Sequence, residues 1–248
     1  MTRRDLLLLG LTMVSACADA ISYLGLGHVF PANMTGNTVL LGVGLATGDM
    51  PEATRSATAL GAFLLGAAAI GAAVPDRLSD RAFRTVVAAE IAMTAAVCGW
   101  WLQVGADAPV GAARYGLIAL FGATMGAQSS MIRLLDVPVS TTYITGTWTA
   151  LSAAATRYVR KPIPGRPRTG NGGHAVQALV VTAYCVTAYG AALAYTFLGG
   201  TATAIPLGIL VLVAVAITLS RCDVEHSAGS FGAQACRRPH SVRRKGLP

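Results

Sequence analysis

Long apolar stretches alternate with short polar segments along this 248-residue chain. Six of the apolar stretches are about 18 residues or longer, the length of helix that crosses a ~30 Å hydrocarbon core. They are Leu6–Leu26, Ala57–Val74, Val86–Val104, Tyr115–Leu135, Ala175–Leu198 and Ala202–Leu219. No soluble fold needs six such stretches, so the pattern predicts an all-α membrane protein with six transmembrane helices.

Composition and charge agree with this pattern. The chain is 54% hydrophobic and only 12% charged, whereas soluble domains carry roughly 25% charged residues. The net charge is +8, and the basic residues gather at the ends of the apolar stretches, near residues 3–4, 77–84, 157–168 and 237–245. With a cytoplasmic N-terminus, six crossings put all four basic clusters on the cytoplasmic side, as the positive-inside rule requires. We therefore interpret the charge as a topology signal and expect no nucleic-acid partner.

The first apolar stretch has two interpretations. The segment "TRRDLLLLGLTMVSACADA" begins with basic residues, continues with an apolar run and ends with small residues, as a secretory signal does. On that interpretation the chain would be cleaved or lipid-modified at Cys17. The apolar run resumes after Asp19, however, and continues to Leu26. We therefore favour an uncleaved first span.

A short motif recurs 110 residues apart, since "MTGNTVLL" (34–41) aligns with "ITGTWTAL" (144–151). Residues 1–112 and 113–220 then each consist of one span, one Thr-Gly motif and two further spans. Three spans in each half would give the halves opposite orientations. The predicted fold is therefore a 3+3 inverted repeat, an arrangement common in transporters. Residues 221–248 follow as a basic cytoplasmic tail whose composition predicts disorder.

Each motif region, 28–48 and 138–158, is predicted to hold an extended segment followed by a short helix. Pro31 disfavours helix ahead of it, and Asn33 or Thr35 can cap a helix that begins near Gly36. If both segments are re-entrant, the two half-helices start near the bilayer middle and offer their N-termini to an anion or polar molecule. Two alternatives stay open: surface turns with interfacial helices, or eight full crossings.

Polar residues at membrane depth complete the predicted substrate-binding site. Asp19 lies deep in the first span, where a carboxylate costs ~3 kcal/mol on insertion scales. It either couples protons or binds solute, or it ties the span to the half-helix through hydrogen bonds. Gln128 and Ser129, at similar depth, line the same cavity or bridge helices. The predicted site residues are Asp19, Asn33, Thr35, Gly36, Asn37, Gln128, Ser129, Thr142, Tyr143, Thr145, Gly146 and Thr147.

Two further features carry structural expectations. Glu90 lies six residues beyond Arg84, which favours an interfacial position or an ion pair with Arg84 over a functional role. Glycines at or near four-residue spacing, Gly122 with Gly126 and Gly66 between Gly61 and Gly71, predict close approach of helices.

Several chemistries have no sequence support. The chain has no phosphate-binding loop, dinucleotide fingerprint, zinc-protease motif or nucleophile elbow. Its five cysteines show no metal-ligand spacing and predict no disulfide. We therefore expect a protein that is not an enzyme, with no catalytic residue, cofactor or metal.

The stretches "DAISYLGLGHVFPANMTGNTVLLGVGLA" and "GAQSSMIRLLDVPVSTTYITGTWTAL" resemble the YoaK-like family of small bacterial membrane proteins. The resemblance covers about Leu6 to Leu219, with Ser129 at a position where many relatives are expected to have Asn. It implies a multi-span protein of the bacterial inner membrane without an established activity. The resemblance supports the architecture but names no substrate.

These features together favour a secondary transporter or permease for a small polar or anionic solute, with Asp19 as the candidate for proton coupling. The alternative is a membrane protein that does not transport: a scaffold, an accessory subunit or a sensor of small ligands. The expected partners are the lipid bilayer and an unidentified solute, and a homo-oligomer stays open.

Overall fold

The computed structural model describes residues 3–73, 80–105, 108–134, 146–149, 151–152, 156 and 172–216. Helices make up nearly all of these residues, and no strand occurs among them. The helices are α1 (Arg3–Gly25), α2 (Met34–Thr47), α3 (Met50–Ala73), α4 (Asp80–Val104), α5 (Gly111–Leu134) and α7 (Gly172–Leu198), followed by the 3-10 helix η1 (Gly199–Thr203) and a helix over residues 204–216. The predicted all-α class is therefore confirmed.

Four helical stretches are long and apolar enough to cross a membrane, judged by length and composition. They are Leu6–Gly25, Met50–Ala73, Arg84–Val104 and Ala175–Ala216. The last contains 42 residues and includes α7, η1 and the helix at 204–216. α5 has 24 residues but is not among the four. A multi-span protein is thus supported, while six spans and the inverted repeat stay predictions.

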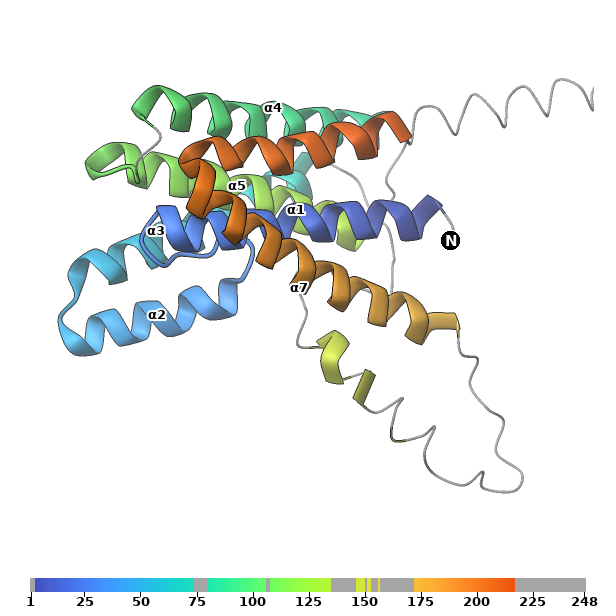
Figure 1. Ribbon diagram of the computed structural model, residues 1–248, viewed down its shortest axis with the longest axis horizontal. Helices are drawn as coiled ribbons and strands as arrows, with labels where there is room; N and C mark the ends of the chain where they lie inside the picture. Colours follow the sequence, from blue (N-terminus) through green and yellow to red (C-terminus); the bar gives the residue numbers. More distant parts are fainter. Residues whose placement is uncertain are drawn as a thin grey trace, which may run out of the picture. The chain divides into compact units, whose positions relative to one another are not determined.

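α1 is the most enclosed of these helices, because 67% of its apolar window is buried against 22–33% in the other three. It packs against α7, which crosses it in Figure 1, and also against α5 and η1. Its buried face includes Leu11, Val14 and Ile21. The core of the bundle therefore surrounds α1, the helix that carries Asp19.

Glycines bring α3 and α5 close together. A Cβ atom on Gly66 would collide with the backbone of Ala123, and one on Gly126 with the carbonyl of Phe63. Gly61 and Gly71, in contrast, have open space at the Cβ position. The predicted close approach is confirmed for Gly66, Gly122 and Gly126. Gly122 lies against Ala59 and Gly126 against Phe63, an order that makes α3 parallel to α5.

The chain divides by its contacts into two units, Met1–Val213 and Ala214–Pro248. The first unit contains every helix named with a label above. Of the second, the structure describes residues 214–216, which are helical. The predicted basic tail at 221–248 lies outside the described residues.

Candidate functional site

A row of polar side chains runs along the buried face of α1. Thr12, Ser15, Asp19 and Ser22 follow one another at intervals of three or four residues, so they share one face of the helix. All four are buried. The hydroxyls of Thr12 and Ser15 donate to carbonyl oxygens one turn back, at 2.7 and 3.1 Å. Asp19 instead bonds to other segments of the chain.

The carboxylate of Asp19 accepts three hydrogen bonds. Its Oδ1 accepts from the backbone N–H of Ala32 at 2.8 Å and of Asn33 at 3.3 Å. Its Oδ2 accepts from the hydroxyl of Tyr184 on α7 at 2.8 Å. Hydrogen bonds to an ionised group are among the strongest in proteins. Asp19 therefore joins α1, α7 and the segment that precedes α2.

The chain after α1 turns back into the bundle. α1 ends at Gly25, and Gly27 and His28 adopt left-handed backbone angles, with φ of 87° and 63°. By residues 32–33 the backbone has returned to Asp19, which lies six residues, or about 9 Å, before the end of α1. α2 then starts at Met34, directly after the two residues whose N–H groups bond to Asp19.

α2 leads back to the end of the bundle where α1 finished. In the second turn of α3, Arg55 donates from Nε to the carbonyl of Gly27 at 2.9 Å, so the start of α3 lies beside the turn that follows α1. α2 joins α3 through a left-handed Gly48 and packs along it. This path, in and out at one end, is the one that a re-entrant hairpin follows.

Two asparagines fix the backbone of the returning segment. Asn33 is the N-cap of α2, with its Oδ1 accepting from the N–H of Gly36 at 3.2 Å. Asn37, which is fully buried, accepts from the N–H of Phe30 at 2.9 Å and donates to the carbonyl of the same residue. The side chain of Asn37 thereby satisfies both backbone hydrogen-bonding groups of Phe30, which lies outside any helix.

Aromatic packing adds to these hydrogen bonds. The ring of Tyr23 stacks on that of Phe30, with centroids 5.1 Å apart, and lies 4.8 Å from the ring of His28. A Cβ atom on Gly36 would meet the ring of Phe30. Thr35 points to the surface and is exposed. Of the predicted motif residues, Asn33, Gly36 and Asn37 thus shape the segment, whereas Thr35 makes no part of this network among the described residues.

The carboxylate of Asp19 lies at the N-terminal end of α2. The N-terminus of a helix carries a partial positive charge and unpaired N–H groups, and it therefore attracts anions. Here a carboxylate of the chain itself occupies that position. The negative charge of Asp19 therefore disfavours an anionic ligand at this position, which the sequence had suggested. It favours an uncharged or cationic ligand.

The side chain of Gln128 on α5 bonds to the same polar face of α1. Its Nε2 donates to the carbonyl of Leu11 at 3.0 Å and to the hydroxyl of Ser15 at 2.9 Å. Ser15 lies one turn before Asp19. The structure therefore brings Gln128 close to the Asp19 region, as a bridge between helices. The neighbouring Ser129 has a buried hydroxyl with no hydrogen-bond partner among the described residues.

The second motif is mostly outside the described residues. Thr142, Tyr143 and Thr145 all fall there. Gly146 is exposed and Thr147 is buried within a short helical piece. The predicted meeting of the two motifs at one site therefore stays a prediction.

Two residues of the polar interior were not predicted as site residues. Tyr184 lies in the middle of α7, whereas tyrosines of membrane helices gather at the interfaces, and this unusual depth was the available signal. Glu90 was expected at the interface or paired with Arg84. It is instead 2% exposed, and neither of its carboxyl oxygens has a hydrogen-bond partner among the described residues.

The described part of the chain offers no metal centre, because no group of three or more His, Cys, Asp or Glu side chains lies close enough to hold an ion. Cys17, Cys98 and Cys185 are free thiols. The polar interior therefore consists of carboxyl, amide and hydroxyl groups.

Long apolar helices packed around a central helix with a buried carboxylate define a multi-span α-helical membrane protein. Residues 7–216 match the family described as protein of unknown function DUF1275, and the chain belongs to this family. It is 30% identical, over 197 residues, to the UPF0700 transmembrane protein YoaK of Bacillus subtilis (strain 168), an alignment that covers 77% of this chain and 84% of that protein. The resemblance to YoaK-like proteins is thereby confirmed. No solved structure matches the chain.

Proposed function

We propose that the chain is a secondary transporter or permease that moves a small polar solute across the bacterial inner membrane. The observation that carries this proposal is the non-helical segment 27–33, which Asp19 holds at the depth of the bundle interior. Irregular backbone inside a membrane is tolerated only where it is buried in protein or lines a cavity. Transporters use such broken segments at their substrate sites.

The predicted six-span topology supplies the second side of the proposed solute path. Six spans with both termini in the cytoplasm would put the second motif opposite the first, and Thr142, Tyr143, Thr145, Gly146 and Thr147 would then form the other side of the solute path. The protein would not be an enzyme and would need no resident cofactor. Because Asp19 already occupies the N-terminus of α2, we propose an uncharged polar solute or a cation rather than an anion.

Swelling of proteoliposomes tests the proposal. Purified protein in liposomes is mixed with glycerol, urea, nitrate or formate, and light scattering reports entry of each solute. We expect at least one uncharged solute to enter faster than in protein-free liposomes. Asp19→Asn removes the charge at the start of α2 with little change in shape, and it should slow that entry.

The control is Asp49→Asn, which changes a carboxyl group at the exposed N-terminus of α3. It should leave solute entry unchanged, because Asn also caps helices well. Rates equal to protein-free liposomes for these four solutes and for methylammonium, a small cation added to the same assay, would contradict the transport proposal. Faster entry of the anions alone would contradict only the proposed solute class.

The second candidate is a scaffold, accessory subunit or ligand sensor that does not transport. The saturation of Asp19 by three internal donors favours it, because such a carboxylate can be purely structural. Cysteines at Asn33 and Thr145, in a chain without native cysteines, separate the two candidates. Transport predicts reactivity with a membrane-impermeant thiol reagent that switches between the two faces of the membrane. A scaffold predicts uniform protection.

A further inference from the structure

Unpartnered polar atoms inside the bundle concentrate on α4 and α5. Among the described residues, both carboxyl oxygens of Glu90, the hydroxyl of Thr94 and Oε1 of Gln128 are buried and have no hydrogen-bond partner. Thr94 lies one turn beyond Glu90 on the same helix. Buried polar groups in native proteins are nearly always paired. These unpartnered atoms therefore indicate that the site binds a further group that is not one of the described side chains or backbone groups.

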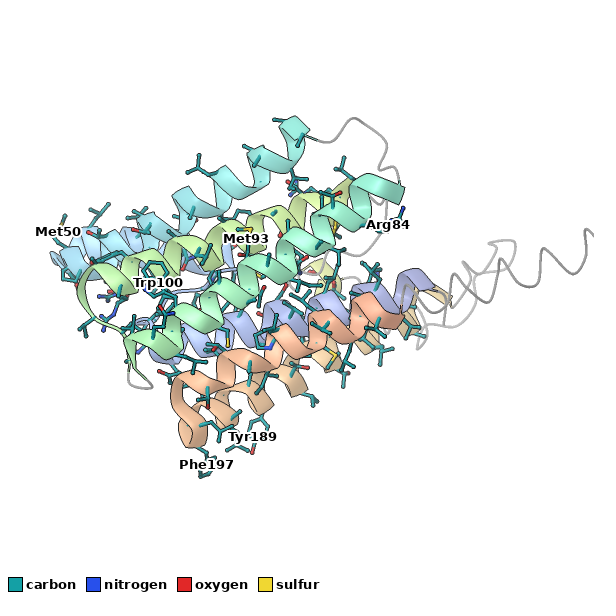
Figure 2. All side chains as sticks on the ribbon, turned by 90° about the horizontal axis from the view of Figure 1, so that it is seen from above. Met50, Arg84, Met93, Trp100, Tyr189 and Phe197 are labelled. Atoms are coloured by element: carbon teal, nitrogen blue, oxygen red, sulfur yellow. The ribbon has the colours of Figure 1, made fainter. Side chains whose placement is uncertain are left out.

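The register of the helices brings Glu90 and Gln128 to one level. α4 and α5 are joined by six residues, 105–110, so they run in opposite directions, and Gly116 contacts Trp100. Gln128 follows Gly116 by 12 residues, and Glu90 precedes Trp100 by 10. At 1.5 Å per residue the two side chains differ in level by about 3 Å. Figure 2 shows this stretch of α4, with Arg84 and Trp100 toward opposite ends and Met93 between them.

The contact between α1 and α4 separately supports the same level for Glu90. A Cβ on Gly25 would lie 2.6 Å from Trp101, so these two residues are level. Glu90 precedes Trp101 by 11 residues, and Ser15 precedes Gly25 by 10. Gln128 bonds to Ser15 directly, at 2.9 Å. Glu90, Gln128 and Ser15 therefore share one level in the interior of the bundle.

Unpartnered acceptors outnumber unpartnered donors at this level, because the only such donors on α4 and α5 near it, among the described residues, are the hydroxyls of Thr94 and Ser129. The amide nitrogen of Gln128 donates to the carbonyl of Leu11 and to Ser15, which uses both of its hydrogens. This bond to a carbonyl also fixes the orientation of the amide, because a carbonyl only accepts. The unpartnered acceptors are Oε1 of Gln128 and the two oxygens of Glu90 when Glu90 is ionised, and no described hydroxyl bonds to any of them. A buried carboxylate without donors is strongly disfavoured.

We propose that Glu90 is a proton-binding site inside the helix bundle, with Oε1 of Gln128 as the acceptor for its proton. A single proton on Glu90 converts one unpartnered acceptor into a donor and removes the buried charge. Asp19 differs, because three donors already stabilise its ionised form, which makes it a positioning residue. The proposal concerns proton binding alone and does not depend on transport.

The surroundings of Glu90 contain few other charges. The titratable side chains described on α4, α5 and α1 are Arg84 and Cys98 on α4, Arg114, Tyr115 and Arg133 on α5, and Cys17, Asp19 and Tyr23 on α1. Tyr184 on α7 bonds to Asp19. η1 and the helix at 204–216 have none. Arg84 and Arg133 are exposed, and Arg114 and Tyr115 lie near Gly116, at the level of Trp100. Asp19 is one turn beyond Ser15 and has its own donors.

Infrared difference spectroscopy of the full-length protein in lipid tests this site. The spectrum of the wild type minus that of Glu90→Gln should show the C=O stretch of one protonated carboxyl group at acidic pH, and this band should disappear as the pH rises. Gln128→Met removes the acceptor and should shift the midpoint toward lower pH by about one unit, a tenfold weaker binding of the proton. Thr94→Val removes a neighbouring unpartnered hydroxyl and should leave the band in place.

Three results would overturn the proposal. The first is the absence of the carboxyl band at every pH at which circular dichroism shows folded protein. The second is a band that persists unchanged to the highest such pH, which would make Glu90 a fixed neutral donor. The third is loss of the band on replacing choline by sodium or potassium at constant pH, which would indicate a cation site instead. None of these measurements uses solute flux, so this proposal and the transport proposal fail separately.

Discussion

At the scale of single residues, Asp19 and Glu90 show how surroundings assign different roles to similar groups. Both are buried, and both lie on helices long and apolar enough to cross a membrane. Asp19 accepts from two backbone N–H groups and one tyrosine hydroxyl, whereas Glu90 has no hydrogen-bond partner among the described residues. The first carboxyl group is a fixed part of the fold. The second is the better candidate for exchanging a proton.

Removal of the Asp19 carboxylate should destabilise the fold strongly. Asp19→Ala leaves the buried N–H of Ala32 and the part-buried N–H of Asn33 and hydroxyl of Tyr184 without their acceptor. A buried group left unpaired costs about 1–3 kcal/mol, and a part-buried group less. We expect a loss of about 3 kcal/mol or more in the free energy of unfolding, measured by denaturant titration in detergent. Tyr184→Phe removes one of the three bonds and should cost roughly a third as much.

The control for this series is Asp49→Ala. Asp49 accepts one bond, from the exposed N–H of Glu52 at 3.0 Å, so its loss should cost only about 1 kcal/mol, as for other N-caps. Equal losses for Asp19→Ala and Asp49→Ala would show that the Asp19 bonds contribute little.

At the scale of elements, the sequence predicted the helices well and their contacts only in part. Each of the six predicted stretches overlaps a described helix, because apolar length is a local property of the sequence. Glycine spacing likewise indicated that helices approach closely, and the structure shows that α3 and α5 are the pair. The N-cap was limited to Asn33 or Thr35 because capping residues are few, and the structure selects Asn33.

Contacts between segments far apart in the chain could not be predicted from the sequence. Tyr184 lies 165 residues from Asp19 along the chain, and no local pattern pairs a mid-helix tyrosine with that carboxylate. The backbone N–H of Ala32 also has no sequence signal that marks it as a donor to Asp19, because every residue except proline has a backbone N–H. Glu90 was expected at the interface or in an ion pair with Arg84, from its distance to Arg84 along the chain. Its burial depends on how α4 turns toward its neighbours, which a single apolar stretch does not specify.

Two glycines on α3 should respond in opposite directions to alanine. Gly66→Ala directs a methyl group into the backbone of Ala123 and should cost about 1–3 kcal/mol of stability, as other overpacked sites do. Gly61→Ala meets nothing within 4 Å and should gain up to about 1 kcal/mol, because alanine favours helix over glycine. Thermal unfolding of both variants in the same detergent measures the difference. A stabilising Gly66→Ala would contradict the close crossing of α3 and α5.

At the scale of the first unit, Met1–Val213, one end of the bundle collects the ends of several helices. Trp101, near the end of α4, contacts Gly25 at the end of α1 and Gly200 in η1. Arg55 bonds to Gly27 beside the same end, so the turn between α2 and α3 also belongs there. If α2 were a full crossing, this turn would lie at the opposite end from the end of α1. The geometry thus argues against α2 as a full crossing, and the number of spans stays a prediction.

Labelling of single cysteines in cells decides between these counts. In a chain without native cysteines, Val110→Cys probes the connection between α4 and α5, and Thr201→Cys probes η1; both positions are exposed. Six spans put the two on the same side of the membrane, so an impermeant maleimide outside intact cells should label both. Eight spans put them on opposite sides, and only one would react. Because α2 is the element on which the counts differ in the first half of the chain, labelling at both positions would support α2 as a half-helix that enters and leaves on one face.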